Sequence, residues 1–106
     1  MDKNKILKDF SNTFFIEKEE MKSYFENNDL DSFDEILKEF EDMRKNTFNI
    51  IWDKSEHLQF TAKEIENLSK KYLIENYSWI DNVGIKAVNN HLLWMCWHEG
   101  IIKNYK

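Results

Sequence analysis

Proline is absent from this chain and glycine occurs only at Gly84 and Gly100, so the residues that usually shape tight turns are nearly missing. β-Hairpin loops depend on such residues, because their backbone adopts conformations that other residues resist. Helices are therefore the favoured element. Because 106 residues suffice for one hydrophobic core, we expect a single all-α domain over residues 1–106.

Apolar side chains follow three- and four-residue steps near the start of the chain, which is the spacing of one face of a helix. The positions in this first segment are Leu7, Phe10, Phe14, Met21, Tyr24 and Phe25. They predict a first helix from about Lys3 to Glu26, which the polar residues Asn27, Asn28 and Asp29 would end.

A second helix is predicted to begin at Ser32, because Ser32 and Glu35 have the spacing of a capping box. This helix either ends at Asn46 or continues to Trp52. The spacing of its apolar residues favours the longer form. Residues 53–60 are then expected to form the longest linker of the chain.

The third helix has the clearest predicted start, since Thr61 and Glu64 have the spacing of a second capping box. Phe60 before the cap can also pack on Ile65 after it, which would fix the direction in which the chain enters the helix. Two independent signals therefore agree on this start.

A fourth helix, capped by Ser78 or Asp81, would run to Glu99. Gly100 can supply the left-handed residue that ends it, followed by an apolar contact at Ile101. Four helices with short connections predict an antiparallel up-down bundle. The residues expected in its core include Phe40, Leu68 and Leu92.

The segment from Leu92 to Trp97 is apolar on every side of the predicted fourth helix, although a surface helix usually has one apolar face. A helical projection directs Leu92 toward the core and places Leu93, Trp94 and Trp97 on the polar side. Either a loop or the tail over residues 101–106 covers these side chains, or they form an interface with a partner.

Residues 17–42 form an acidic segment with eleven carboxylates against three lysines, a balance of −8, whereas the whole chain carries −5. Such a segment repels phosphate, so no nucleic acid partner is expected, and it would steer a basic protein toward it. The alternative is a solvated face, partly neutralised by helical pairs such as Asp34 with Lys38 and Glu41 with Lys45. The candidate partner-binding carboxylates are Asp31, Asp34, Glu35, Glu39, Glu41 and Asp42.

His91 and His98 are the main hint of metal binding or catalysis. Seven residues separate them, so they would lie roughly 10 Å apart along one helix, too far to share a zinc ion without a third element. Cys96 would point away from both, and Glu99 alone forms no carboxylate pair. The sequence also has no phosphate-binding glycine loop and no nucleophile motif. We therefore expect no metal, no cofactor and no enzymatic activity.

Three features bear on location. The longest apolar run, residues 92–97, is far shorter than the roughly 18 residues that span a bilayer, so no membrane partner is expected. Charged residues interrupt the first nine positions, which lack the hydrophobic region of a signal peptide. Cys96 has no second cysteine with which to pair. Together these features predict a reducing, cytoplasmic environment.

The sequence therefore predicts a small acidic cytoplasmic protein-binding module whose partner is a basic protein. Its size and charge resemble those of small helical immunity and inhibitor proteins that neutralise nucleic-acid-handling toxins, a similarity of composition without a shared motif. The alternative is a structural homo-oligomer, in which Leu93, Trp94 and Trp97 pack against a second copy of the chain.

Overall fold

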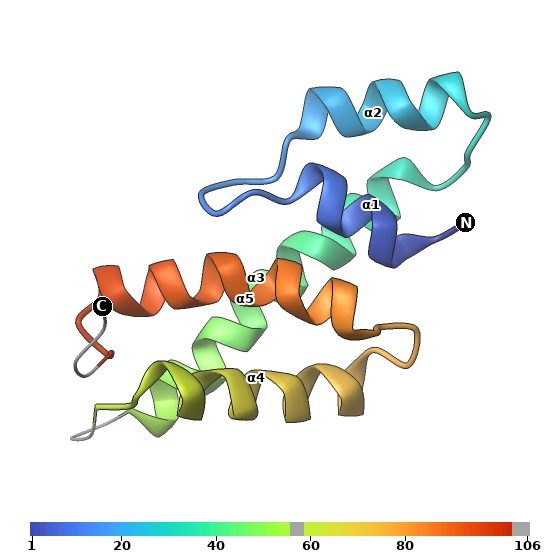
Figure 1. Cartoon of the computed structure of the whole chain (residues 1–106). Helices are drawn as coiled ribbons and strands as arrows, with labels where there is room; N and C mark the ends of the chain where they lie inside the picture. The colour runs from blue at the N-terminus through green and yellow to red at the C-terminus, as the bar shows by residue number, and fades with distance from the viewer. Residues whose placement is uncertain (56–58, 103–106) are drawn as a thin grey trace.

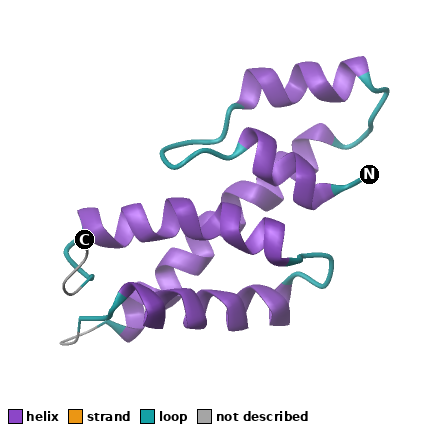
Figure 2. Cartoon of the chain, viewed as in Figure 1, coloured by secondary structure: helices purple, strands orange, loops and turns teal. Residues whose placement is uncertain are grey.

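The computed structural model of the chain describes residues 1–55 and 59–102. Within these residues it contains five α-helices and no strand, which confirms the predicted all-α class (Figure 1, Figure 2). None of the helices in this part is long and apolar enough to cross a membrane. The helices are α1 (Lys3–Phe10), α2 (Lys18–Asn27), α3 (Phe33–Lys54), α4 (Ala62–Asn76) and α5 (Asn82–His98).

Helix α5 is central, because it packs against α1, α3 and α4 (Figure 1). α4 and α5 form an antiparallel hairpin, while the long α3 runs at a slant behind α1 and α5 and also contacts α2. The molecule is consequently elongated, with extents of 47 × 24 × 19 Å. The predicted up-down bundle of four helices is not confirmed, since the described residues form five helices and α3 crosses its neighbours.

The helix predicted from Lys3 to Glu26 is wrong in its middle, where residues 11–17 form a loop between α1 and α2. We call these residues the aromatic loop, because Phe14 and Phe15 lie at its tip. The loop opens with serine, asparagine and threonine, whose short polar side chains compete with a helix for backbone hydrogen bonds. The apolar spacing alone did not reveal this interruption.

The capping box predicted at the start of α3 is also wrong. Ser32 adopts a left-handed conformation with φ of 67°, and its side chain makes no capping hydrogen bond. Asp29, in the same connection, is left-handed as well, with φ of 51°. At its other end α3 continues past Trp52 to Lys54, which confirms the longer form. Of the predicted linker, residues 56–58 lie outside the described part of the chain.

The predicted start of α4 is confirmed. The Thr61 hydroxyl accepts from the Glu64 N–H at 3.2 Å, and the Glu64 carboxylate accepts from the Thr61 N–H at 2.9 Å. Phe60 and Ile65 belong to the same apolar cluster, as the predicted contact across the cap requires.

The ends of α5 also follow local signals. Asp81, and not Ser78, caps the helix, because its carboxylate accepts from two N–H groups of the first turn at 2.9 and 3.3 Å. Gly100 has φ of +75°, the left-handed conformation predicted for it. The Ile101 N–H then donates to the Cys96 carbonyl at 2.9 Å, which closes the helix end.

Two clusters of buried side chains form the core. The larger one joins α1, α2, α3, the end of α4 and the first half of α5 around Phe40. The smaller one joins the ends of α3 and α5 to the first part of α4 around Leu92. Both residues are fully buried, as predicted. Leu68 is only half-buried at the edge of the smaller cluster.

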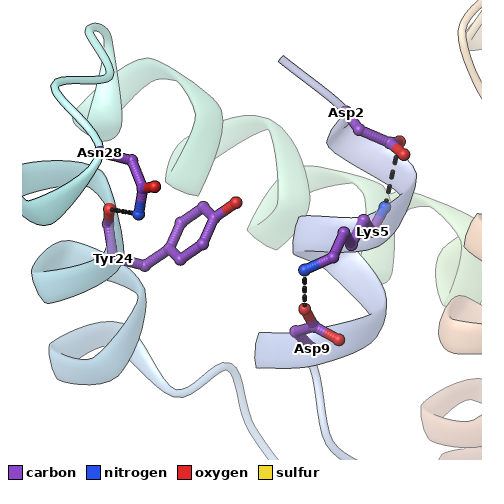
Figure 3. Close-up of polar contacts among 5 residues, drawn as sticks. All are labelled: Asp2, Lys5, Asp9, Tyr24 and Asn28. Atoms are coloured by element: carbon purple, nitrogen blue, oxygen red, sulfur yellow. Dashed lines mark hydrogen bonds and ion pairs between the residues drawn. The ribbon is translucent and has the colours of Figure 1, made fainter.

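Lys5 and Tyr24 hold α2 against α1. The ring of Tyr24 points toward α1, where the Lys5 Nζ atom lies 5.7 Å from the ring centroid (Figure 3). Lys5 is oriented by an ion pair with Asp9 at 2.9 Å, and its N–H donates to the capping carboxylate of Asp2 at 3.2 Å. At the end of α2 the Asn28 side chain donates to the Tyr24 carbonyl at 2.8 Å.

Asn4 joins α1 to the start of α5. Its side chain donates to the Trp79 carbonyl at 2.9 Å and accepts from the Asp81 N–H at 3.0 Å. Gly84 lies beside it, and a Cβ atom at this position would lie only 2.3 Å from the Asn4 Oδ1 atom. The lack of a side chain at Gly84 therefore lets the two helices approach closely.

Candidate docking surface

The aromatic loop is ordered from within by Asn12. Its Oδ1 atom accepts hydrogen bonds from the N–H groups of Phe14 and Phe15, at 2.8 and 2.9 Å. This is an Asx turn, in which a side chain replaces a backbone acceptor. Ser11 and Ile16 at the two ends of the loop form an isolated antiparallel bridge. The loop is therefore a defined turn whose tip carries two phenylalanines.

Arg44 of α3 anchors the loop from the protein interior. Its Nη2 atom donates to the Ser11 hydroxyl at 2.8 Å and also to the Asn12 carbonyl. Although Arg44 is only 7% exposed, its Nε atom has no hydrogen-bond partner among the described residues. Burial lowers the pKa of Arg44 to about 10, so the guanidinium stays protonated at neutral pH. An unpaired buried N–H of this kind lowers the free energy of unfolding by about 1–3 kcal/mol.

His91 of α5 provides the second anchor. Its Nδ1 atom lies 2.8 Å from the Thr13 carbonyl, which can only accept, so Nδ1 carries the proton. Burial and the nearby Arg44 charge lower the pKa of His91, although the bond to Thr13 opposes them. The imidazole is therefore neutral at pH 7 and acts as a hydrogen-bond donor to the loop.

The tip of the loop is exposed. Phe14 and Phe15 are 61% and 58% exposed, which is unusual for large apolar side chains on an ordered backbone. Phe14 packs edge-on against Trp94 of α5, with ring centroids 5.1 Å apart. Trp94 in turn stacks on His98 at 5.3 Å. These side chains form an aromatic surface of the kind that interface hot spots use.

A groove of about 550 Å³ lies between the aromatic loop, α3 and α5. Its lining combines aromatic and charged side chains, and the Glu41 carboxylate among them pairs with Lys18 at 3.2 Å. The lining includes the apolar side chains Phe15, Phe48 and Met95 and the polar or charged side chains Lys18, Glu41, Arg44, Lys45 and His91.

The six carboxylates predicted for partner binding divide into two groups. Asp31, Asp34 and Glu35 are exposed at the start of α3, and none of them forms an ion pair with another described residue. The remaining three are paired with lysines at 2.9, 3.2 and 2.8 Å, respectively: Glu39 with Lys3, Glu41 with Lys18, and Asp42 with Lys38.

These pairs differ from the expected ones. Lys38 binds Asp42, one turn after it, instead of Asp34. Glu41 reaches Lys18 on α2 instead of Lys45 on its own helix. The tertiary contact between α2 and α3 therefore replaces a local pair that the sequence spacing favoured.

Leu93, Trp94 and Trp97 do not form one continuous face. Leu93 packs against the smaller core cluster, and Trp94 is partly covered by Phe14. Trp97 is 54% exposed. Residues 101–102 of the tail turn into the core and leave Trp97 uncovered within the described part of the chain.

The two histidines of α5 flank Trp94, with ring centroids 6.2 Å away for His91 and 5.3 Å for His98. Among the described residues, no group of three or more His, Cys, Asp or Glu side chains could hold a metal ion. Cys96 is buried, and burial raises the pKa of its thiol to about 12. Its thiol is therefore protonated and unreactive at neutral pH.

No sequence pattern pointed to Phe15 or Arg44 as site residues, and the helical spacing placed Phe14 on the core face of a predicted helix. The available signal was the run of three polar residues before Phe14, which interrupts the helical pattern. Arg44 gave no comparable signal, because its partner Ser11 lies 33 residues away in the sequence.

Comparisons with protein-family models, curated proteins and solved structures found no match for this chain. Its function is therefore inferred from its own surface and charges. The described residues show three surface features: exposed aromatic rings, exposed carboxylates and a groove lined partly by cations. All three are features of binding.

Proposed function

We propose that this chain is a protein-binding module that docks its partner through Phe14 and Phe15. The observation that carries the proposal is the exposure of both rings on a loop that Asn12, Arg44 and His91 hold in one conformation. Aromatic side chains on an ordered backbone lose little conformational entropy on binding, so they make effective anchors.

The charge distribution supports a basic partner. The aromatic loop leads directly into α2, whose first turn carries the exposed Glu19 and Glu20. Negative charge around an anchor raises the rate at which a basic protein associates with it. The other carboxylates that we propose for this role are Asp31, Asp34 and Glu35.

An immunity or inhibitor protein is the narrower form of this proposal. Such a protein would use the aromatic loop to dock on a basic enzyme, such as a nucleic-acid-handling toxin, and would bind without catalysis in the cytoplasm. The acidic segment over residues 17–42 supports it, because a surface of this charge competes with nucleic acid for a basic site.

The proposal is tested by using the wild type and two matched variants as bait to capture binding proteins from a lysate of the native cell. The double variant Phe14→Ser/Phe15→Ser removes the anchor, and Ile74→Ser removes a similarly exposed apolar side chain from α4, 52% exposed. We expect one protein to be captured by the wild type and by Ile74→Ser and lost with the double variant. Equal capture by both variants would contradict docking through the loop.

The contribution of charge is tested on the captured protein. The variant Asp31→Lys/Asp34→Lys should slow its association at low salt and affect dissociation much less. Glu39, Glu41 and Asp42 are unsuitable for this test, because reversing them would also break ion pairs. An association rate that is the same for wild type and variant would exclude steering by these carboxylates.

Self-association through Trp97 is the second candidate function. Its support is the 54% exposure of this tryptophan near the end of α5. This candidate is tested by sedimentation of the wild type over a range of concentrations, with Trp97→Ala as the matched variant. A dimer that weakens by about 2 kcal/mol in the variant would favour the oligomer, and a monomer at every concentration would exclude it.

A further inference from the structure

The groove beside the aromatic loop combines apolar side chains with more cationic than anionic groups among its described lining residues. Phe15 from the loop, Phe48 from α3 and Met95 from α5 supply apolar surface, and Arg44 and Lys45 supply charge. Its volume of about 550 Å³ lies within the range of pockets that bind small molecules.

Arg44 is the unusual member of this set. It is more than nine-tenths buried, yet its hydrogen bonds go to a neutral hydroxyl and a neutral carbonyl, and its Nε atom has no partner among the described residues. Buried guanidinium groups normally face a carboxylate or a phosphate.

The remaining charges do not supply that anion. Glu41, the carboxylate among the groove-lining side chains, pairs with Lys18 at 3.2 Å. His91, the imidazole of the lining, donates to the Thr13 carbonyl and supplies no negative charge. The lining therefore holds three permanent cations, Lys18, Arg44 and Lys45, against one carboxylate.

We propose that this groove binds a small organic carboxylate with an aromatic body. The carboxylate would lie against Arg44 and Lys45, and the ring would lie between Phe15 and Phe48. A carboxylate complements the guanidinium through charge-assisted hydrogen bonds, and aromatic walls favour an aromatic ligand. This site shares Phe15 with the proposed docking loop. Its test needs no protein partner, because ligand binding is measured on the isolated chain.

If Arg44 only orders the aromatic loop, the groove will not distinguish anions from neutral molecules. If Arg44 also binds a carboxylate, the groove will prefer the anion. The two roles are separated by titrating the full chain with phenylacetate, benzyl alcohol and acetate, and following backbone amide signals by nuclear magnetic resonance. Benzyl alcohol keeps the ring without the charge, and acetate keeps the charge without the ring.

We expect phenylacetate to bind at least about tenfold more tightly than either control, which is the ratio that one charge-assisted hydrogen bond supplies. The amide signals that move should be those of Phe15, Phe48 and their neighbours. Equal affinity for phenylacetate and benzyl alcohol, or no saturable binding of phenylacetate, would overturn the proposal.

A pair of exposed lysines on α3 tests the location without disturbing the buried Arg44. Lys45→Gln removes charge from the groove, whereas Lys54→Gln removes it from the last turn of the same helix. We expect phenylacetate affinity to fall about threefold in Lys45→Gln and to stay unchanged in Lys54→Gln. An equal effect in both variants would contradict the assigned site.

Discussion

The Nη2 atom of Arg44 lies 2.8 Å from the Ser11 hydroxyl, across 33 residues of sequence. This bond joins the middle of the longest helix to the loop that separates α1 from α2. The next two loop carbonyls, those of Asn12 and Thr13, accept from Arg44 and His91. Three consecutive residues are thus held by two helices, and tertiary contacts set the position of the exposed aromatic rings.

Asn12→Ala tests the order of the loop. The variant removes the acceptor for the N–H groups of Phe14 and Phe15. We expect faster amide hydrogen exchange at those two residues and a loss of about 1 kcal/mol in the free energy of unfolding. Asn67→Ala, at an exposed position of α4, is the control. The same exchange rates at both phenylalanines in the two variants would show that the Asx turn does not order the loop.

Helix ends were predictable where the signal is local. Thr61 and Gly100 act within a few residues of themselves, and both predictions are confirmed. Ser32 has the same local pattern as Thr61, but it follows a turn with a left-handed Asp29 and is itself left-handed, so its side chain cannot cap α3. The loop between α1 and α2 depends on Arg44, which no local pattern reveals.

The candidate surface was predictable only in part. The helical projection correctly separated the buried Leu92 from the exposed Trp97. It could not show that Phe14 covers Trp94, because that contact joins residues 80 positions apart from two different elements. Exposure of Phe14 itself follows from the turn that replaces the predicted helix.

Gly84→Ala should destabilise the fold, although helix propensity alone predicts a gain of about 1 kcal/mol. The added Cβ atom would lie 2.3 Å from the Asn4 Oδ1 atom and 2.7 Å from the Ile80 Cγ1 atom. We expect a net loss of about 1–3 kcal/mol in urea unfolding. Lys86→Ala, at an exposed position of the same helix, serves as the control. Stabilisation by Gly84→Ala would mean that Asn4 can move aside freely.

Stability should fall in mild acid because of His91. Burial lowers its pKa in the folded state below the ordinary value of 6.5, so the unfolded chain binds this proton first. The free energy of unfolding should therefore decrease as the pH falls from 6.5 toward the folded pKa. His91→Gln should remove this component. A resonance titration that places the folded pKa above 6.5 would reverse the sign and refute the prediction.

Leu92→Ala and Leu68→Ala test the extent of the smaller core cluster. Leu92 is fully buried, so we expect its truncation to cost about 2–5 kcal/mol in urea unfolding. Leu68 is half-buried, so its truncation should lower the free energy of unfolding clearly less, because part of its surface is already in water. An equal loss in both variants would show that Leu68 belongs to the core as fully as Leu92.

The most direct test of the proposed function is photo-crosslinking in the native cell. A benzophenone-bearing amino acid replaces Phe15 in one variant and Ile74, equally apolar and exposed on α4, in another. We predict a single crosslinked product with a basic protein from position 15 and none from position 74. Crosslinks of equal yield from both positions, or no product from position 15, would contradict docking through the aromatic loop.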